Sequence, residues 1–270
     1  MADGCLHDKV IVIVGGTTGM GLSAAKACAA AGARVLAVGP AGAEAEEAGK
    51  TLKDSGRVFV ADARDAQMIE RAMQYAVDYL HGLDGVYHVA GGSGRKAGDG
   101  PLHEMSDDGW DFVVKLNLTS MIYSNRAAVR QFLKRGKGGT VLNMGSVLPI
   151  SPSPKFFATH GYAAVKSAVI GLTRSCAAYY AKDNIRFNAI LPGLVATPMS
   201  QRASGDEAIM RFIRTKQPLD GGRIGQSEDL DAAVVYFLSG GSKFATGQVL
   251  MVDGGWSVTE GQYVGDAEIS

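Results

Sequence analysis

The sequence has few cysteines, no net charge and no long apolar run, and each deficit excludes a class of protein. Its 270 residues carry 27 basic and 27 acidic side chains, so the formal charge is zero. A basic surface for nucleic acid is therefore not expected. The three cysteines (Cys5, Cys28 and Cys176) show neither metal-ligand nor disulfide spacing. We accordingly expect reduced thiols, a cytoplasmic protein and no metal site.

The apolar residues are spread through the chain rather than gathered in membrane segments. The start of the chain is polar and carries Asp3 and Asp8, which argues against a signal peptide. The run Val10–Val14 is far too short to cross a bilayer, so no membrane association is expected. Hydrophobic residues make up 46 % of the chain, enough for a large core. No repeat or linker divides the sequence, and residues 1–270 are expected to form a single domain.

Short β-branched runs alternate with helical patterns along the chain. Strands are predicted over residues 9–14, 34–38, 58–60, 85–89, 140–144, 185–191 and 249–252. Helices are predicted over residues 19–31, 41–54, 66–80, 107–134, 160–182 and 227–238. Such alternation is typical of right-handed crossovers between parallel strands. It predicts an α/β fold with a doubly wound, Rossmann-type parallel sheet of about seven strands and helices on both faces.

A glycine-rich turn, Gly15-Gly16-Thr17-Thr18-Gly19-Met20-Gly21, follows the first predicted strand. Glycines let the backbone turn sharply and approach a ligand closely. The next helix would direct its free N–H groups and positive dipole end at the turn, which suits a pyrophosphate. The alternative is a tight strand–helix turn without a ligand, but its place at the first such turn of the fold favours nucleotide binding.

Tyr162 and Lys166 are four residues apart in a predicted helix, so they share one face. A phenol with a pKa of about 10 is a poor base at neutral pH. A neighbouring ammonium and the positive charge of an oxidised nicotinamide would lower that pKa, and three units correspond to about 4 kcal/mol. Tyr162 could then take or give a proton during hydride transfer. Taken alone, the pair could be a chance solvated pair on a helix surface.

The Gly-x-x-x-Gly-x-Gly turn and the Tyr-x-x-x-Lys pair together resemble the short-chain dehydrogenase/reductase family. The similarity runs from Lys9 to Trp256 and implies one dinucleotide-binding and catalytic domain that binds NAD or NADP at the carboxyl edge of the sheet. It implies that Ser146 orients the substrate, with a turn or cap serine as the alternative. It further implies that Asn117 kinks its helix and links water to Lys166, with an interior structural asparagine as the alternative.

The resemblance also implies a set of cofactor contacts. In this set Asp62 lies against the adenine, although it could instead be a helix N-cap or turn aspartate. The segment from Pro192 to Thr197 holds the carboxamide end of the nicotinamide. The full implied set is Gly15, Thr17, Thr18, Gly19, Met20, Gly39, Asp62, Ala63, Val89, Ala90, Gly91, Tyr162, Lys166, Pro192, Val195 and Thr197.

Three features depart from the family pattern. Val14 stands where threonine is common, and His88-Val89 replaces two asparagines. A packed, hydrogen-bonded role for His88 is favoured over a catalytic one. The interval from Ser146 to Tyr162 is about three residues longer than usual and contains the stiff, proline-rich segment 148–157. That segment either lies over the substrate entrance or is a plain surface insertion.

The cofactor and substrate are less specified. Gly39 provides no acid for a ribose hydroxyl, but no cation for a 2′-phosphate is evident and Glu44 would repel one, so NAD is favoured over NADP. The substrate is expected to be a small alcohol or ketone. Arg95, Lys96 and Lys155 indicate either an anionic substrate or ordinary surface charge. Residues 199–218 form either a mobile cover or ordinary packing.

Small residues on the helix that bears Tyr162, namely Ala163, Ala164, Ala168 and Gly171, suit close helix–helix contact. With an expected final edge strand, they predict a homotetramer or homodimer. Oxidoreduction is the leading hypothesis for activity. A catalytically silent nucleotide-binding sensor or scaffold is the main alternative, motivated by His88-Val89. Cofactor-assisted epimerisation or dehydration is a third reading.

Overall fold

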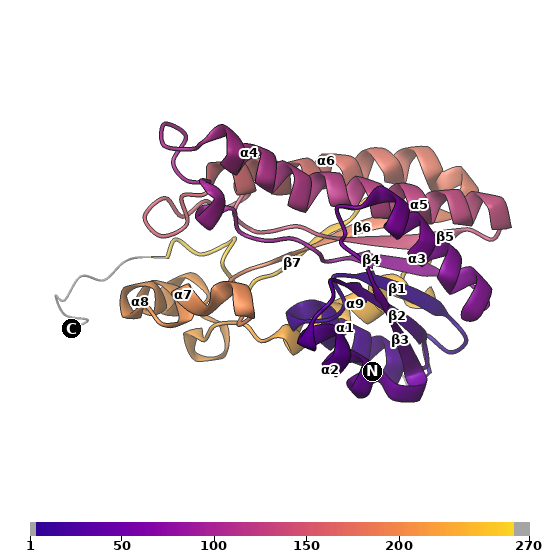
Figure 1. Cartoon of the computed structure of the whole chain (residues 1–270). Coiled ribbons are helices and arrows are strands. Elements are labelled where there is room, and N and C mark those ends of the chain that lie inside the picture. Colours follow the sequence, from indigo (N-terminus) through magenta and orange to yellow (C-terminus); the bar gives the residue numbers. More distant parts are fainter. Residues whose placement is uncertain (1–3, 262–270) are drawn as a thin grey trace.

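The computed structural model describes residues 4–261, and a parallel sheet lies at the centre of that region (Figure 1). The sheet has seven strands in the order β3-β2-β1-β4-β5-β6-β7, and all neighbours are parallel. The strands are β1 (Val10–Val14), β2 (Arg34–Gly39), β3 (Gly56–Val60), β4 (Gly85–His88), β5 (Gly139–Met144), β6 (Ile185–Pro192) and β7 (Val249–Val252). The predicted doubly wound fold is confirmed.

Helices cover both faces of the sheet (Figure 1). One face carries α3 (Ala66–Tyr79), α5 (Ser120–Arg135) and α6 (His160–Tyr180), and the other carries α1 (Gly19–Ala30), α2 (Ala43–Leu52) and α9 (Asp231–Leu238). Strand β1 is buried throughout because successive side chains point to opposite covered faces. Val12 packs into the core under α3 and α5, whereas Ile13 packs into the core under α1 and α9.

The helix predicted over residues 107–134 is divided into three parts. α4 (Asp107–Val113) leads into a π-helical turn (Val114–Thr119), and α5 follows. Asn117 lies in the turn, and its Nδ2 donates to the Val113 carbonyl at 3.1 Å. In an α-helix that carbonyl would accept the backbone N–H of Asn117, so the side chain competes with regular helix formation. The interruption therefore falls at the residue expected to kink the helix.

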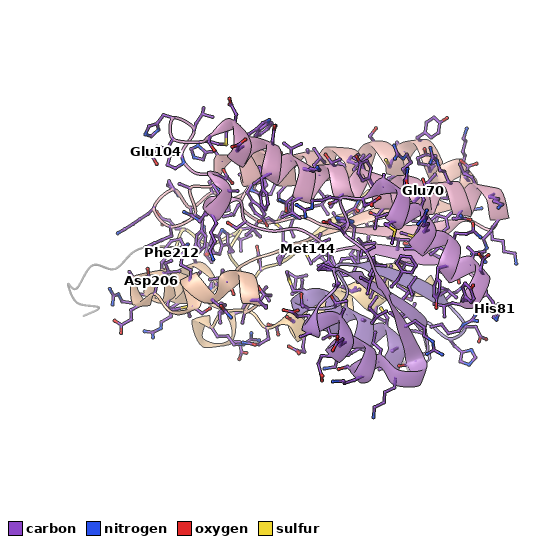
Figure 2. The ribbon with its side chains drawn as sticks, viewed as in Figure 1. Glu70, His81, Glu104, Met144, Asp206 and Phe212 are labelled. Atoms are coloured by element: carbon purple, nitrogen blue, oxygen red, sulfur yellow. The ribbon has the colours of Figure 1, made fainter. Side chains whose placement is uncertain are left out.

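Residues 148–157 and the segment after β6 pack together in a small apolar cluster. This segment includes α7 (Gln201–Ser204) and α8 (Glu207–Lys216), and Figure 2 shows Phe212 and Asp206 at the end of the molecule away from His81. Trp256 is 1 % exposed, and its ring lies 5.8 Å from that of Phe212 and 5.6 Å from that of Phe157. Its indole N–H donates to the Ser151 carbonyl at 2.9 Å. The proline-rich segment is thus anchored against α8 and Trp256.

Candidate active site

A cleft of about 380 Å³ opens at the carboxyl edge of the sheet. The strand order changes direction there, because β1 lies between β2 and β4, and such a switch point is where α/β sheets bind ligands. Arg64, Pro40, Leu116 and Pro198 line the cleft in addition to residues expected from the sequence. The expected residues that line it are Gly15, Thr17, Thr18, Gly19, Met20, Asp62, Ala63, Val89, Ala90, Gly91 and Thr197.

The turn after β1 leaves no space for side chains at Gly15, Gly16 and Gly21. Gly15 has a φ of +89°, and a Cβ there would lie 2.5 Å from the Ala90 nitrogen. A Cβ on Gly21 would lie 1.9 Å from the Gly15 oxygen. Thr18 precedes α1, makes no side-chain cap, and the first turn of α1 contains no acidic residue. The free backbone N–H groups at the start of α1 are thus available to an anionic ligand. The glycine-rich turn and this helix start therefore fit the pyrophosphate of a dinucleotide.

Gly39, the expected position of a cofactor-selecting acid, does not line the cleft. The side chain of Thr17 is buried and packs over it, and a Cβ on Gly39 would lie 2.2 Å from Thr17 Oγ1. An acidic side chain at residue 39 would therefore require Thr17 to move. Gly39 therefore fits the space that the Thr17 side chain leaves.

Asp62 forms an ion pair with Arg64 on the cleft wall. The shortest contact is 2.6 Å, and the Arg64 backbone N–H also donates to the carboxylate at 2.8 Å. The side-chain hydrogen bond from Arg64 lowers the pKa of Asp62. Asp65, not Asp62, caps α3, because its carboxylate accepts the N–H groups of Gln67 and Met68. The sequence shows no evident cation for the adenosine part of a cofactor, and Arg64 on the cleft wall corrects that expectation.

Tyr162 and Lys166 lie together beside the cleft. The Lys166 Nζ is 5.6 Å from the centre of the Tyr162 ring and donates to the Met144 carbonyl at 2.9 Å. Burial lowers the pKa of Lys166 to about 8. Burial raises the pKa of Tyr162 to about 12, although a hydrogen bond with Ser146 acts in the opposite direction. The four-residue spacing therefore brings a phenol and an amine into one largely desolvated site.

Asn117 connects this pair to the cleft wall. Its Oδ1 accepts the Gly92 N–H at 2.9 Å, and its Nδ2 donates to the Gly92 carbonyl at 3.0 Å. A Cβ on Gly91 would lie 2.6 Å from Asn117 Oδ1 and 3.4 Å from Lys166 Nζ. Since Gly91 lines the cleft, both side chains lie directly behind that wall. The structure thus brings Asn117, Ser146, Tyr162 and Lys166 to one place.

His88 lies in the interior next to this group. Its Nδ1 is 2.8 Å from Ser124 Oγ, and its Nε2 is 3.3 Å from Ser120 Oγ. Burial, followed by repulsion from Lys166, lowers the pKa of His88 to about 3. Its ring is neutral at physiological pH and fully enclosed, as expected for a packed, hydrogen-bonded histidine.

Asp99 supports the helix that carries Tyr162, a role not apparent from the sequence. Its buried carboxylate accepts the N–H groups of Gly161 at 2.9 Å and Tyr162 at 3.0 Å. Thr159, the residue just before α6, makes no side-chain cap of its own. A carboxylate at a helix N-terminus satisfies free N–H groups and interacts favourably with the helix dipole. Asp99 therefore fixes the first turn of α6 from a loop about 60 residues away in sequence.

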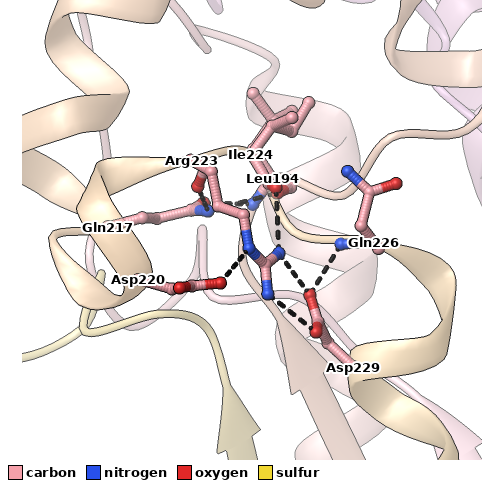
Figure 3. Close-up of polar contacts among 7 residues, drawn as sticks. All are labelled: Leu194, Gln217, Asp220, Arg223, Ile224, Gln226 and Asp229. Carbon is pink, nitrogen blue, oxygen red and sulfur yellow. Dashed lines mark hydrogen bonds and ion pairs between the residues drawn. The ribbon is translucent and has the colours of Figure 1, made fainter.

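The backbone after β6 is held by Gln217 (Figure 3). Gln217 is 2 % exposed; its Oε1 accepts the Leu194 N–H at 2.5 Å and its Nε2 donates to the Leu194 carbonyl at 3.2 Å. Nearby, Arg223 pairs with Asp220 and Asp229, as Figure 3 shows. Val195 is buried there and lines a separate cavity, whereas Thr197 lines the cleft at the carboxyl edge of the sheet.

Pro192 ends β6, and its carbonyl accepts the Val147 N–H at 3.2 Å, directly after Ser146. This bond ties the loop after β6 to the loop after β5.

Within residues 4–261, no helix is long and apolar enough to cross a membrane. Nor does the described part of the chain contain three or more His, Cys, Asp or Glu side chains grouped to hold a metal ion.

Comparisons with known proteins agree over nearly the whole chain. The family described as enoyl-(acyl carrier protein) reductase matches residues 14–257. The chain is 35 % identical to 2-(S)-hydroxypropyl-CoM dehydrogenase 3 of Xanthobacter autotrophicus, covering 93 % of this chain and 97 % of the relative. It is 34 % identical to 2-dehydro-3-deoxy-D-gluconate 5-dehydrogenase of Dickeya dadantii, covering 93 % and 96 %. A solved short-chain type dehydrogenase/reductase from Mycobacterium ulcerans has a TM-score of 0.86 at 28 % identity, covering 94 % and 92 %.

Proposed function

The chain belongs to the short-chain dehydrogenase/reductase family, and on that premise we propose Tyr162 as the general acid–base of its reaction. The protein is an NAD(P)-dependent oxidoreductase that acts on an alcohol or ketone carbon of a small molecule. The observation that supports the role of Tyr162 is its desolvated pairing with Lys166 behind the cleft wall at Gly91. The nicotinamide supplies or accepts the hydride when bound.

Each of the four proposed catalytic residues has a separate role in binding the reacting oxygen and transferring its proton. Ser146 donates a hydrogen bond to the reacting oxygen, and Tyr162 gives that oxygen a proton in reduction or removes one in oxidation. Lys166, with a pKa of about 8, is mostly an ammonium at pH 7 and stabilises the phenolate. Asn117 holds the backbone at Gly92 and orders the turn beside Lys166.

The burial of Tyr162 increases the free energy needed to lower its pKa to neutrality. Lowering its pKa from about 12 to 7 requires about 7 kcal/mol, more than the 4 kcal/mol expected for a free phenol. The ammonium of Lys166 and the positive charge of an oxidised nicotinamide both act in that direction. With a neutral reduced cofactor the phenol stays protonated, which is the form that donates a proton to a ketone.

The cofactor proposal is NAD rather than NADP. The residues that would hold it are those of the glycine-rich turn, the Asp62–Ala63 segment, the backbone from Val89 to Gly91, and the loop from Pro192 to Thr197. Arg64 is a cation on this wall, but its guanidinium is already paired with Asp62. Turnover measured with each cofactor tests this, and a strong NADP preference contradicts it.

The assembly proposal is a homotetramer or homodimer of single-domain subunits. Ala164, Ala168 and Gly171 are exposed along α6, and such small residues allow close helix approach. Strand β7 forms an edge of the sheet, with Leu250 and Met251 40 % and 37 % exposed. The three free thiols suit the reducing cytoplasm, where we place the protein. Sedimentation that shows only monomer at micromolar concentration contradicts the assembly.

The test of function is a panel of secondary alcohols and ketones read by the absorbance of the reduced cofactor. Tyr162→Phe should abolish turnover by at least about 10²-fold, the typical contribution of general acid–base catalysis, and leave cofactor affinity unchanged. Tyr123→Phe, at a half-buried tyrosine on α5, is the matched control. Full activity in Tyr162→Phe contradicts the assignment. Cofactor binding without turnover on any panel member favours a silent nucleotide-binding protein instead.

A further inference from the structure

Two arginines from distant parts of the chain converge on one backbone carbonyl. Arg95 Nη2 lies 3.0 Å from the Phe156 oxygen, and Arg202 Nη2 lies 3.4 Å from the same atom. Each guanidinium has five N–H donors, so a single neutral acceptor uses only a small part of either. The contact brings together two positive charges from segments 107 residues apart in sequence. Together they offer more hydrogen-bond donors than one carbonyl oxygen can accept.

The segments that carry these residues all begin at the catalytic site. Arg95 follows Gly92, which is bonded to Asn117, by three residues, a span of at most about 11 Å. Arg202 follows Pro198 on the cleft wall by four residues, about 6–8 Å along helical backbone. Phe156 belongs to the segment between Ser146 and Tyr162. The chain lengths therefore keep the arginine pair within reach of the segments that carry the proposed catalytic residues.

No carboxylate of the described chain is in ion-pair contact with either arginine. Neither guanidinium has an ion-pair partner within 4.0 Å among residues 4–261. Partial burial, and then repulsion from Arg202, lower the pKa of Arg95; Asp99 acts in the opposite direction. Asp99 is itself engaged by the first turn of α6. The Nζ of Lys155 also lies near this segment, 5.4 Å from the centre of the Phe156 ring.

The apolar cluster behind the carbonyl holds the pair in place. The Phe156 ring lies 5.1 Å from the ring of Phe212, in the same cluster as buried Trp256. The carbonyl of Phe156 is therefore a fixed point on which both arginine side chains are oriented, and little conformational entropy is lost when they bind an anion. Planar guanidinium groups match the geometry of a carboxylate and bind it through paired hydrogen bonds.

We propose that Arg95 and Arg202 form a subsite for a carboxylate on the substrate, so that the enzyme acts on short hydroxy acids and keto acids. This inference rests on the proposed function, because it assigns the substrate class of the same active site. The basic residues of these segments were expected to indicate either an anionic substrate or ordinary surface charge. The proposal favours an anionic substrate. The subsite is separate from the cofactor cleft, whose lining includes Arg64 but neither of these arginines.

The test compares keto acids of four to seven carbons with their neutral methyl esters, which keep the shape and lose the charge. The wild-type enzyme should use its best acid at least about tenfold better than the matching ester in kcat/KM, the effect of a single charge-assisted hydrogen bond. Arg95→Gln and Arg202→Gln should each reduce that ratio, mainly through KM of the acid, and the double variant should bring it close to one. A purely structural role for the arginines would change both substrates equally and leave the ratio intact.

Arg71→Gln on α3 is the matched control, because Arg71 is also exposed but lies on a helix remote from the entrance. It should leave the ratio unchanged, and thermal unfolding confirms that every variant folds. A wild-type ratio near one, or a ratio that survives in the double variant, overturns the subsite while the oxidoreductase function stands. If neither acids nor esters are turned over, the proposed function fails. Binding of 4-oxopentanoate to the cofactor-loaded protein, measured by calorimetry, then tests the subsite. The wild type should bind it more tightly than the double variant, and equal or absent binding in both overturns the subsite.

Discussion

Replacing Asp99 by alanine removes the only carboxylate cap on the first turn of α6 among the described residues. Two buried N–H groups, of Gly161 and Tyr162, would lose their acceptor. Hydrogen bonds to charged groups contribute about 1.5–3 kcal/mol each, and loss of a helix cap about 0.5–2 kcal/mol. Because the two bonds share one carboxylate, we expect the free energy of unfolding to fall by about 2–4 kcal/mol.

This loss should be visible in both stability and catalysis. For a chain of 270 residues, 1 kcal/mol corresponds to about 2 °C, so a loss of about 2–4 kcal/mol lowers Tm by about 4–8 °C. Because Tyr162 is the third residue of α6, fraying of this turn moves the phenol, and a displacement of about 1 Å lowers kcat by up to about 10²-fold. Thermal unfolding by circular dichroism and steady-state turnover measure the two effects.

Two further variants make the experiment specific. Asp99→Asn keeps one acceptor oxygen without the charge, so its Tm and kcat should lie between those of wild type and Asp99→Ala. Asp108→Ala, at an exposed position in the first turn of α4, should change Tm by no more than about 2 °C, since an exposed charge near a helix N-terminus contributes about 1 kcal/mol or less. An Asp99→Ala protein that melts and turns over like wild type would refute the reasoning.

Three more predictions follow from buried contacts. Gly91→Ala should lower kcat at least about tenfold, because its Cβ would meet Asn117 Oδ1 at 2.6 Å; unchanged kinetics contradict this, and Gly240→Ala, where a Cβ meets nothing within 4 Å, is the control. Gln217→Ala should reduce stability by about 2–4 kcal/mol, because the buried Leu194 N–H and carbonyl lose their partners; an unchanged urea midpoint contradicts it. Burial raises the pKa of Asp231 to about 6, so its contribution to stability is present below its unfolded pKa of about 3.8 and is lost as pH rises through 6. Asp231→Asn should therefore be more stable than wild type at pH 8 by about 1 kcal/mol, a value reduced for partial exposure, and no more stable at pH 3.5; a difference independent of pH contradicts it.

The fold could be predicted because its signals are local. An apolar run such as Val10–Val14 and the glycine-rich turn after it specify a buried strand and a strand–helix connection within about ten residues. The comparisons confirm the predicted family. The four-residue spacing of Tyr162 and Lys166 similarly predicted their shared helix face. Their catalytic role stays a prediction until it is measured.

The residues that support the site could not be predicted in this way. Asp99 bonds to a helix 62 residues later, and Gln217 bonds to a loop 23 residues earlier. A single aspartate or glutamine has no spacing pattern that reveals such a partner, because the pairing is set by the packing of the whole fold. Arg64 lies in the loop after β3, and its ion pair with Asp62, which no sequence spacing reveals, holds its side chain at the cleft wall. The π-helical form of residues 114–119 likewise depends on Gly92, which holds the Asn117 amide.

That π-helical turn also sets the orientation of everything that follows it. A π turn contains one more residue than an α turn, and one residue corresponds to a rotation of about 100° about the helix axis. Deleting a single residue there would turn Ala128 and Phe132 of α5 away from the sheet and their solvent-facing neighbours toward it. An apparently redundant residue in this stretch therefore keeps a sixteen-residue helix facing the correct way, so length here is constrained as tightly as chemical identity.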